Sequence, residues 1–336
     1  MKRQTAILLA FILTTLFGCK NDREFSEVKN LSDFENTQFV PTMENKNAHD
    51  KNSVYCATLL FAWDDIRKQI HTPLEISDDY PDLRRLNESN SFLNVLKSDE
   101  YAVSGEVEGD IVKARAEFSR SLPFEIKLQS FKNKLIFEGQ KVSSFGVKGD
   151  GSYQQLERIK IIYYKNDDNF ILKLLPKDKE HEIILLKTEK KFYSISEMMG
   201  EIEARTEMGK REKKNERNHW KYFYAEEDEV VIPKFNFNIE TNYPAIEGTK
   251  FSSANQNYLI EKAWQRVAFI LDESGAKMES KAEMVVAIED MEDDFENPKP
   301  KKMIFDKPFL ILLKRTESKN PYFGLWLTNA ELMMKE

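Results

Sequence analysis

The feature that most constrains the fold is a series of short β-prone segments between residues 101 and 187. Runs rich in β-branched and aromatic residues are separated there by Gly, Asp, Asn or Pro-Lys-Asp turns, a pattern typical of strands. The run from Glu157 to Lys187 predicts a meander of three antiparallel strands, joined by the turns KNDDN and PKDKEH. The predicted strands are 101–104, 111–118, 124–128, 134–138, 141–147, 156–164, 169–175 and 181–187.

Helices and further strands flank this series. Residues 53–70 place apolar side chains at steps of three and four, with charged side chains off that stripe, and Ser53 is suited to cap the helix. The other predicted helices are 80–86, 91–96, 195–211 and 257–263. The other predicted strands are 229–243, 266–271, 303–315 and 322–328, the last two as a buried hairpin. The predicted fold class is α+β, with large antiparallel or mixed sheets and packed helices.

The N-terminus predicts export. Two basic residues precede an apolar run that is too short to span a bilayer, so residues 1–18 read as a signal peptide. The sequence LFGC, which ends at Cys19, resembles a bacterial lipobox and predicts lipidation of that cysteine; ordinary cleavage and an uncleaved anchor are the alternatives. Residues 19–50 are polar and predict a flexible tether, and 51–336 one folded domain. We expect a membrane-anchored lipoprotein of the cell envelope.

Composition excludes several function classes. The formal net charge of −7 and the absence of a basic stripe argue against nucleic-acid binding. The four histidines are scattered, and no spacing of His, Cys or Asp predicts a metal site or a cofactor. Phosphate-loop and nucleophile-elbow motifs are missing, so we expect no enzymatic activity. Cys56 has no predicted disulfide partner and reads as a small buried residue. We expect a monomer.

The stretch that begins at Ala276 alternates in character. Its even-numbered residues are small or apolar, while the odd-numbered ones up to Glu283 are charged. The even-numbered set is Ala276, Met278, Ser280, Ala282, Met284 and Val286. In a strand this set would face a core and the charged set would face water. The acidic tract that follows, 289–302, predicts an exposed loop. The pattern therefore favours a segment that can be a strand in one state and a loop in another.

The order of segments resembles the serpin family, most clearly in the last third of the chain. Ile232 to Phe235 (IPKF) is similar to the Leu-Pro-Lys-Phe strand entry of serpins. Asp272 to Gly275 (DESG) is similar to the Glu-x-Gly entry of the reactive loop, and Phe305 to Leu310 (FDKPFL) to the strand that follows the loop. The upstream likeness is fainter and fits a shortened serpin.

The resemblance implies a function. Serpins inhibit proteases when their loop is cut and inserts into a central sheet that has room for one more strand. The implied partner is a serine or cysteine protease, and the implied scissile bond lies near Glu289 and Asp290. The implied hinge residues are Glu273, Gly275, Ala276, Met278, Ser280 and Ala282.

Several residues depart from the serpin pattern. The long side chain of Met278 stands where serpins prefer alanine, and it would slow insertion into a tight core. The loop is longer than usual, and Phe323-Gly324-Leu325-Trp326 replaces the closing Phe-x-Gly-Arg pattern. Two alternatives therefore stay open: a non-inhibitory binding or structural lipoprotein with this fold, and an unrelated cell-surface binding module.

Overall fold

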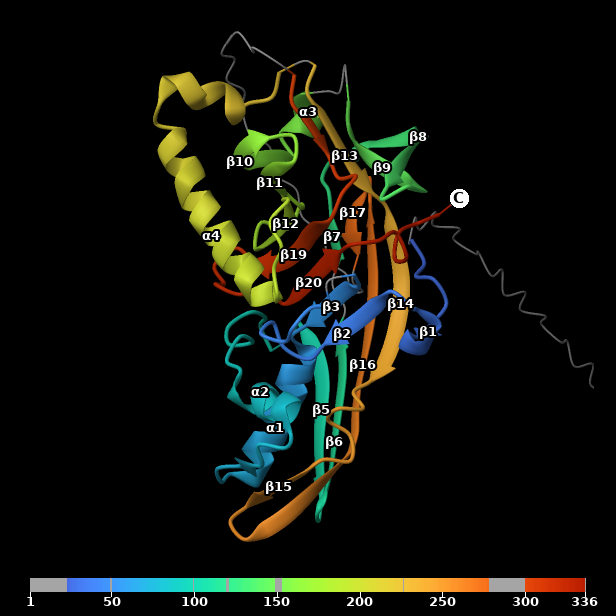
Figure 1. The fold of residues 1–336 in the computed structure, drawn as a ribbon, viewed down its shortest axis with the longest axis vertical. Coiled ribbons are helices and arrows are strands. Elements are labelled where there is room, and N and C mark those ends of the chain that lie inside the picture. Colours follow the sequence, from blue (N-terminus) through green and yellow to red (C-terminus); the bar gives the residue numbers. More distant parts are fainter. Residues whose placement is uncertain are drawn as a thin grey trace, which may run out of the picture.

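The computed structural model shows three β-sheets with helices packed against them (Figure 1). It describes residues 23–335 apart from residues 49, 99, 119–120, 149–152, 226 and 278–299. The largest sheet runs along the long axis of the molecule, and the other two lie beside its upper half (Figure 1). The predicted α+β class with large mixed sheets is confirmed.

The nine-stranded sheet is organised around one long strand. It contains β1 (Lys29–Asn30), β4 (Glu75–Ile76), β5 (Tyr101–Glu108), β6 (Ile111–Phe118), β7 (Ser121–Pro123), β14 (Phe235–Asn242), β15 (Lys250–Ser253), β16 (Gln256–Asp272) and β17 (Gly275–Lys277). The central β16 pairs antiparallel with β14, β15 and β17 and parallel with β6. Alternate residues of β16 such as Ala263, Val267 and Phe269 are buried, as expected for a sheet with one face on a core.

The seven-stranded sheet contains the predicted meander. Its order is β10 (Ile159–Asn166), β11 (Asn169–Leu174), β12 (His181–Lys187), β19 (Phe309–Arg315), β20 (Phe323–Leu327), β3 (Asn52–Cys56) and β2 (Thr37–Val40). The antiparallel pairing of β10, β11 and β12 confirms the meander, and that of β19 with β20 confirms the closing hairpin. Every residue of β12, β20 and β3 is buried, so these strands are covered on both faces.

The four-stranded sheet joins segments from the middle and the end of the chain. Its order is β18 (Lys302–Ile304), β13 (Glu229–Pro233), β9 (Gln140–Val147) and β8 (Gln129–Phe137). Here β18 lies parallel to β13, and β13 lies antiparallel to β9. Lys234 alone separates β13 from β14, so this residue links the four-stranded sheet to the nine-stranded one.

The helices cover the sheets. They are α1 (Thr58–Ile70), α2 (Pro81–Glu88), α3 (Tyr153–Leu156), α4 (Ile195–Glu212) and the 3-10 helices η1 (Leu31–Asp33) and η2 (Glu216–Lys221). The buried stripe of α1 packs on β5 and β6, and a Cβ on Gly105 of β5 would lie 2.7 Å from the Ala62 carbonyl oxygen. Helix α4 runs beside the seven-stranded sheet (Figure 1), where it contacts β10. No helix in the described ranges is both long and apolar enough to cross a bilayer.

Four local predictions are wrong. Residues 52–56 form β3 because they are held between β2 and β20, and the helix starts only at Thr58, after Ala57. Residues 91–96 form turns instead of a helix, and the predicted helix at 257–263 is part of β16. The strand predicted at 124–128 lies earlier, as β7. In the first three cases sheet pairing or tertiary packing overrides a short helical pattern.

The predicted tether at 19–50 is also corrected where the structure describes it. From Arg23 onward the chain lies on the folded body: β1 pairs with β14, and β2 pairs in parallel with β3. Phe39, Val40 and Met43 are buried in the core. Although this segment is polar, main-chain pairing and a few apolar side chains are sufficient to hold it.

Candidate functional site

The predicted hinge begins a three-residue strand at one end of the nine-stranded sheet. Strand β17 pairs antiparallel with both β16 and β7, so it lies between them. Its register matches Gly275 with Asp272, Ala276 with Leu271 and Lys277 with Ile270. Ala276 is fully buried, whereas Lys277 is partly exposed. The turn before β17 is fixed by two main-chain hydrogen bonds: Phe124 N donates to Ser274 O at 2.9 Å, and Leu128 N donates to Glu273 O at 2.8 Å.

Gly275 is required by the close approach of two segments. Its φ of +111° is strained for any residue with a side chain. A Cβ at this position would lie 2.4 Å from the Leu122 carbonyl oxygen and 2.6 Å from the Phe124 nitrogen. These atoms are backbone and cannot move aside easily. Any other residue here would push β17 away from β7.

An ion pair fixes the turn that precedes β17. Lys234 Nζ lies 2.6 Å from Glu273 Oε2 and donates a hydrogen bond to Ser130 Oγ at 2.8 Å. Burial of the Glu273 carboxyl would raise its pKa, but the hydrogen bond and charge of Lys234 outweigh burial, so the pKa of Glu273 lies below its usual value. Since Lys234 also joins β13 to β14, the pair ties the turn to the junction of two sheets.

Below β17 the same sheet is closed by a parallel pair. Strands β6 and β16 pair directly from Ile111 with Leu259 to Glu117 with Arg266, with one register shift after Ile260. The expected room for one more strand is therefore not an open slot among the strands that the structure describes. A strand that continued β17 in its own direction would have to separate β6 from β16.

The strand that follows residues 278–299, β18, is held differently. Strand β18 lies against β13, and the preceding Lys301 is buried with its Nζ 2.5 Å from Asp228 Oδ2. Both side chains are within 1% of full burial. Lys301 Nζ also donates to the Trp220 carbonyl at 3.0 Å, and Lys301 N donates to Asp228 Oδ1 at 2.6 Å.

The structure brings together three of the predicted site residues. Glu273, Gly275 and Ala276 form the turn and the start of β17. The other predicted residues lie outside the described residues: Cys19, Met278, Ser280, Ala282, Glu289 and Asp290. Lys234 belongs to the IPKF motif, which was noted for its likeness to a serpin strand. Nothing in the sequence identified it as the partner of Glu273. The contacts of Arg23 and Asp228 carried no sequence signal.

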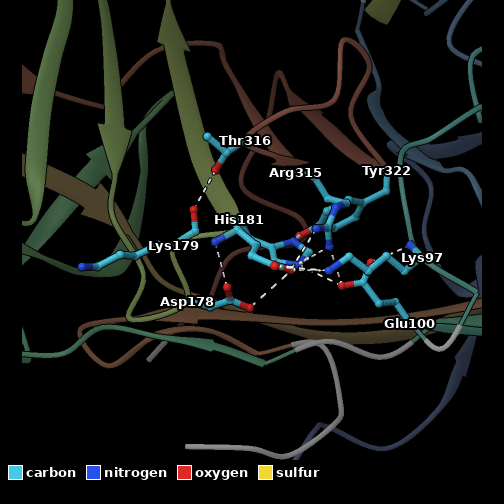
Figure 2. Close-up of polar contacts among 9 residues, drawn as sticks. Lys97, Glu100, Asp178, Lys179, His181, Arg315, Thr316 and Tyr322 are labelled. Carbon is cyan, nitrogen blue, oxygen red and sulfur yellow. Dashed lines mark hydrogen bonds and ion pairs between the residues drawn. The ribbon is translucent and has the colours of Figure 1, made fainter. Parts of the chain in front are cut away.

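A cluster around the buried His181 is a second group of titratable side chains (Figure 2), with Glu100 buried and Glu180 and Lys97 exposed. His181 Nδ1 lies 3.1 Å from the Tyr322 hydroxyl, and its Nε2 lies 3.1 Å from Glu100 Oε1. Arg315 donates to Glu100 at 2.8 Å and to Glu180 at 2.8 Å. Hydrogen bonds from Lys97 and Arg315 lower the pKa of Glu180 to about 2.

This cluster has the ligand atoms for a metal but also its own cations. Oxygen and nitrogen atoms of Glu100, Glu180 and His181 lie within 4.8 Å of one another. A divalent ion would have to displace the Arg315 guanidinium and the Lys97 ammonium, which already balance the carboxylates. We therefore assign the cluster a structural role, in which it ties β12 and β19 to the chain that precedes β5.

Comparisons with known proteins give structural likenesses only. Similar solved structures include thyroxine-binding globulin in complex with thyroxine, with a TM-score of 0.35 and 11% identity over 65% of this chain and 55% of that chain. Mouse protein-Z dependent protease inhibitor is similar with a TM-score of 0.38 and 15% identity over the same shares. The chain thus spans 55% of the length of each. No family model matches the chain, and no curated protein sequence does.

Proposed function

We propose that this chain is a serpin-like protease inhibitor, held at the bacterial cell envelope by a lipid on Cys19, that acts by cleavage and insertion of the loop after β17. The observation that carries the proposal is the position of β17. It is antiparallel to both of its neighbours and lies directly above a parallel pair of strands. Further insertion would replace one parallel interface by two antiparallel ones.

The register of β17 supports this proposal. Continued without a shift, it would pair residue 278 with Phe269, residue 280 with Val267 and residue 282 with Gln265. Because Ala276 faces the core together with its partner Leu271, the even-numbered residues would face inward. These are the small and apolar residues of the alternating segment. The charged, odd-numbered residues would face outward.

The length of β16 also fits the proposed scissile bond. In the same register, residue 288 would pair with Leu259, close to the first residue of β16, Gln256. Glu289 and Asp290 follow directly. A cut there would release a segment whose length matches the strand that receives it. The acidic residue before the cut would suit a protease with a basic specificity pocket.

The proposed mechanism uses the free energy of strand insertion. The nucleophile of a serine or cysteine protease attacks the scissile carbonyl, the C-terminal part of the loop leaves as an amine, and the N-terminal part stays attached to the protease as an ester or thioester. Each ladder hydrogen bond formed on insertion contributes about 0.5–1.5 kcal/mol net. Under the proposal, the bonds formed over roughly ten inserted residues outweigh the bonds lost when β6 separates from β16, and the remainder distorts the attached protease.

The proposed anchor would place the hinge near the membrane. Arg23 contacts the Gly275 carbonyl, and Cys19 precedes Arg23 by four residues. Four extended residues reach about 14 Å at most. A lipid on Cys19 would therefore hold the β17 end of the molecule close to the bilayer, where an envelope inhibitor would meet a protease that acts on the cell surface.

Cleavage of the loop tests the insertion mechanism. The loop between Val286 and Lys302 is cut once with a promiscuous protease, and thermal melting is compared before and after the cut. About ten new ladder bonds at ~1 kcal/mol each predict a rise in Tm of roughly 15 °C, because the entropy of unfolding of a chain of this length is about 0.7 kcal/mol/K. An unchanged Tm would overturn insertion. Incubation with a panel of serine and cysteine proteases should also give a complex that survives denaturing electrophoresis.

A second function is favoured by the closed sheet. The direct pairing of β6 with β16 extends over most of β6, and this pairing opposes insertion. A non-inhibitory binding or structural lipoprotein would keep the pair closed after a cut. Its signature is a clean cut by the protease, without a covalent complex and without a change in Tm.

A further inference from the structure

The N-terminal segment 23–30, which we call the N-terminal strap, lies along β14 and reaches the hinge. We propose that this strap holds β17 in the sheet and that Arg23 is the positioning residue of the hinge. The inference deepens the proposed function, since it concerns the strand from which insertion would start. Its direct test, however, uses the intact chain and does not require that the loop ever inserts.

Arg23 forms hydrogen bonds with both ends of the turn before β17. Its Nη1 donates to Asp272 Oδ1 at 2.6 Å and to the Gly275 carbonyl at 2.9 Å. The side chains of Arg23 and Asp272 are only 22% and 16% exposed. Asp272 Oδ1 in turn accepts a hydrogen bond from Ser274 N at 2.7 Å. One guanidinium therefore connects the last residue of β16 with the first residue of β17.

Lys277, at the other end of β17, also contacts the N-terminal strap. Its Nζ donates to the Arg23 carbonyl at 2.6 Å and lies 5.1 Å from the centre of the Phe25 ring. An ammonium group over an aromatic face is attracted to it. The strap thus holds β17 at its first and its last residue, while Ala276 between them faces the core.

The strap is itself fixed to the sheet. Asn236 of β14 accepts a hydrogen bond from Ser26 N at 2.9 Å and donates to the Glu24 carbonyl at 3.2 Å. Asn238 donates to the Ser26 carbonyl at 3.0 Å, and β1 continues the strap as a strand parallel to β14. These side-chain hydrogen bonds fix the N-terminal strap on β14 and so fix the position of Arg23.

These contacts favour insertion instead of opposing it. They involve residues of β17 that are already paired with β16 and β7, so they persist when a strand grows beyond Lys277. They are lost when β17 leaves the sheet. The strap thus stabilises the state in which the three residues of β17 are already paired with β16. Insertion would only have to extend this strand, so the unfavourable formation of its first pairs is avoided.

Hydrogen exchange at the hinge tests the role of Arg23. Mass spectrometry of the intact full chain follows deuterium uptake in peptides that cover 270–277. Arg23→Ala should raise the exchange rate of these amides about tenfold, which corresponds to 1.4 kcal/mol. Lys277→Met should act in the same direction, and Arg23→Lys should restore part of the protection because the ammonium can still reach Asp272.

The control is Arg84→Ala in α2. Arg84 pairs with Asp78 and Glu88 on the exposed surface, so this variant also removes one arginine and its ion pairs, and it should leave exchange at 270–277 unchanged. Unchanged exchange at 270–277 in both Arg23→Ala and Lys277→Met would overturn the proposal. Equal acceleration over the whole chain would overturn it as well, because that result indicates general destabilisation.

Cleavage of the loop separates the two proposals. If insertion occurs, the rise in Tm after the cut should develop about tenfold more slowly in Arg23→Ala than in the unmodified chain, with a similar final Tm. If the strap is right and insertion is wrong, Arg23→Ala changes exchange at the hinge while the cut leaves Tm unchanged in both proteins.

Discussion

The two strands that flank residues 278–299, β17 and β18, are of equal length but are held by different kinds of contact. Strand β17 is held by the ion pairs Arg23–Asp272 and Lys234–Glu273, whose side chains are 14–27% exposed. Strand β18 is preceded by the ion pair Lys301–Asp228, whose side chains are at most 1% exposed. Strand β17 is bound on both edges, whereas the structure records β13 as the partner of β18.

The difference in the exposure of these ion pairs indicates that β17 and β18 differ in how easily they can be released. Breaking a buried ion pair leaves an uncompensated charge in the core and is costly, while partly hydrated pairs are exchanged for water at little cost. The β18 end is therefore the fixed end, and it stays with β13 while the β17 end can lengthen or leave. Under the proposed function, the intact loop resists full insertion because β18 would have to detach, and a cut removes that restraint.

The largest effect is expected at the fixed end. Asp228→Asn removes the charge that balances Lys301 but keeps the side-chain volume. Because the Lys301 ammonium is buried, we expect the free energy of unfolding to fall by about 3–5 kcal/mol. Urea denaturation followed by intrinsic fluorescence measures this change.

An exposed carboxylate provides the matched control for Asp228. Glu207→Gln removes one member of the Glu207–Lys210 pair on α4, whose side chains are 59% and 65% exposed, and should change stability by less than about 0.5 kcal/mol. A loss at Asp228 as small as that at Glu207 would remove the basis for calling the β18 end fixed.

The next largest effect is expected at the turn before β17. Gly275→Ala combines an unfavourable φ with the clash against Leu122 and Phe124, so it should expel β17 and destabilise the protein by about 2–3 kcal/mol. The control is Gly248→Ala, because Gly248 also has a positive φ, of +77°, but open space around its Cβ. It should cost only about 1 kcal/mol. Equal losses in the two variants would mean that β17 is not tightly held between β16 and β7.

Much of the sheet architecture could be predicted from local sequence. The predicted bounds of β6 and β12 match the structure, and a turn stands directly before each strand, at residues 109–110 and 179–180. The start of β16 was predicted as a helix because Asn257 to Ala263 is short and its apolar residues fit both periods. Pairing with β15 and β6, which lie far away in the sequence, decides its conformation.

The candidate site was predictable only in part for the same reason. Glu273, Gly275 and Ala276 are adjacent in sequence, so a local motif and the alternation after it identify them. The contact between Arg23 and Asp272 joins residues 249 positions apart and depends on how the N-terminal strap lies on β14. The polar composition of that strap predicted a free tether because the strap has few apolar residues. Composition gives no information about the main-chain bonds that hold the strap on β14.

The smallest effect, and the sharpest test of the hydrated end, concerns Lys234. Burial alone would raise the pKa of Glu273, but the hydrogen bond and charge of Lys234 hold it below the ordinary range of a glutamate, so the pair stabilises the fold above that range and the contribution disappears as pH falls through the lowered pKa. At pH 7, Lys234→Met should cost about 0.5–1 kcal/mol, because solvent screens a pair of this exposure. Urea denaturation at pH 7 and at pH 3 should show this difference at pH 7 and a smaller one at pH 3. Lys210→Met, which breaks an exposed pair on α4, should cost much less at pH 7. If the loss in Lys234→Met were equally large at both pH values, packing of the Lys234 side chain, and not the ion pair, would hold the turn. The difference between β17 and β18 could then not be attributed to the exposure of their ion pairs.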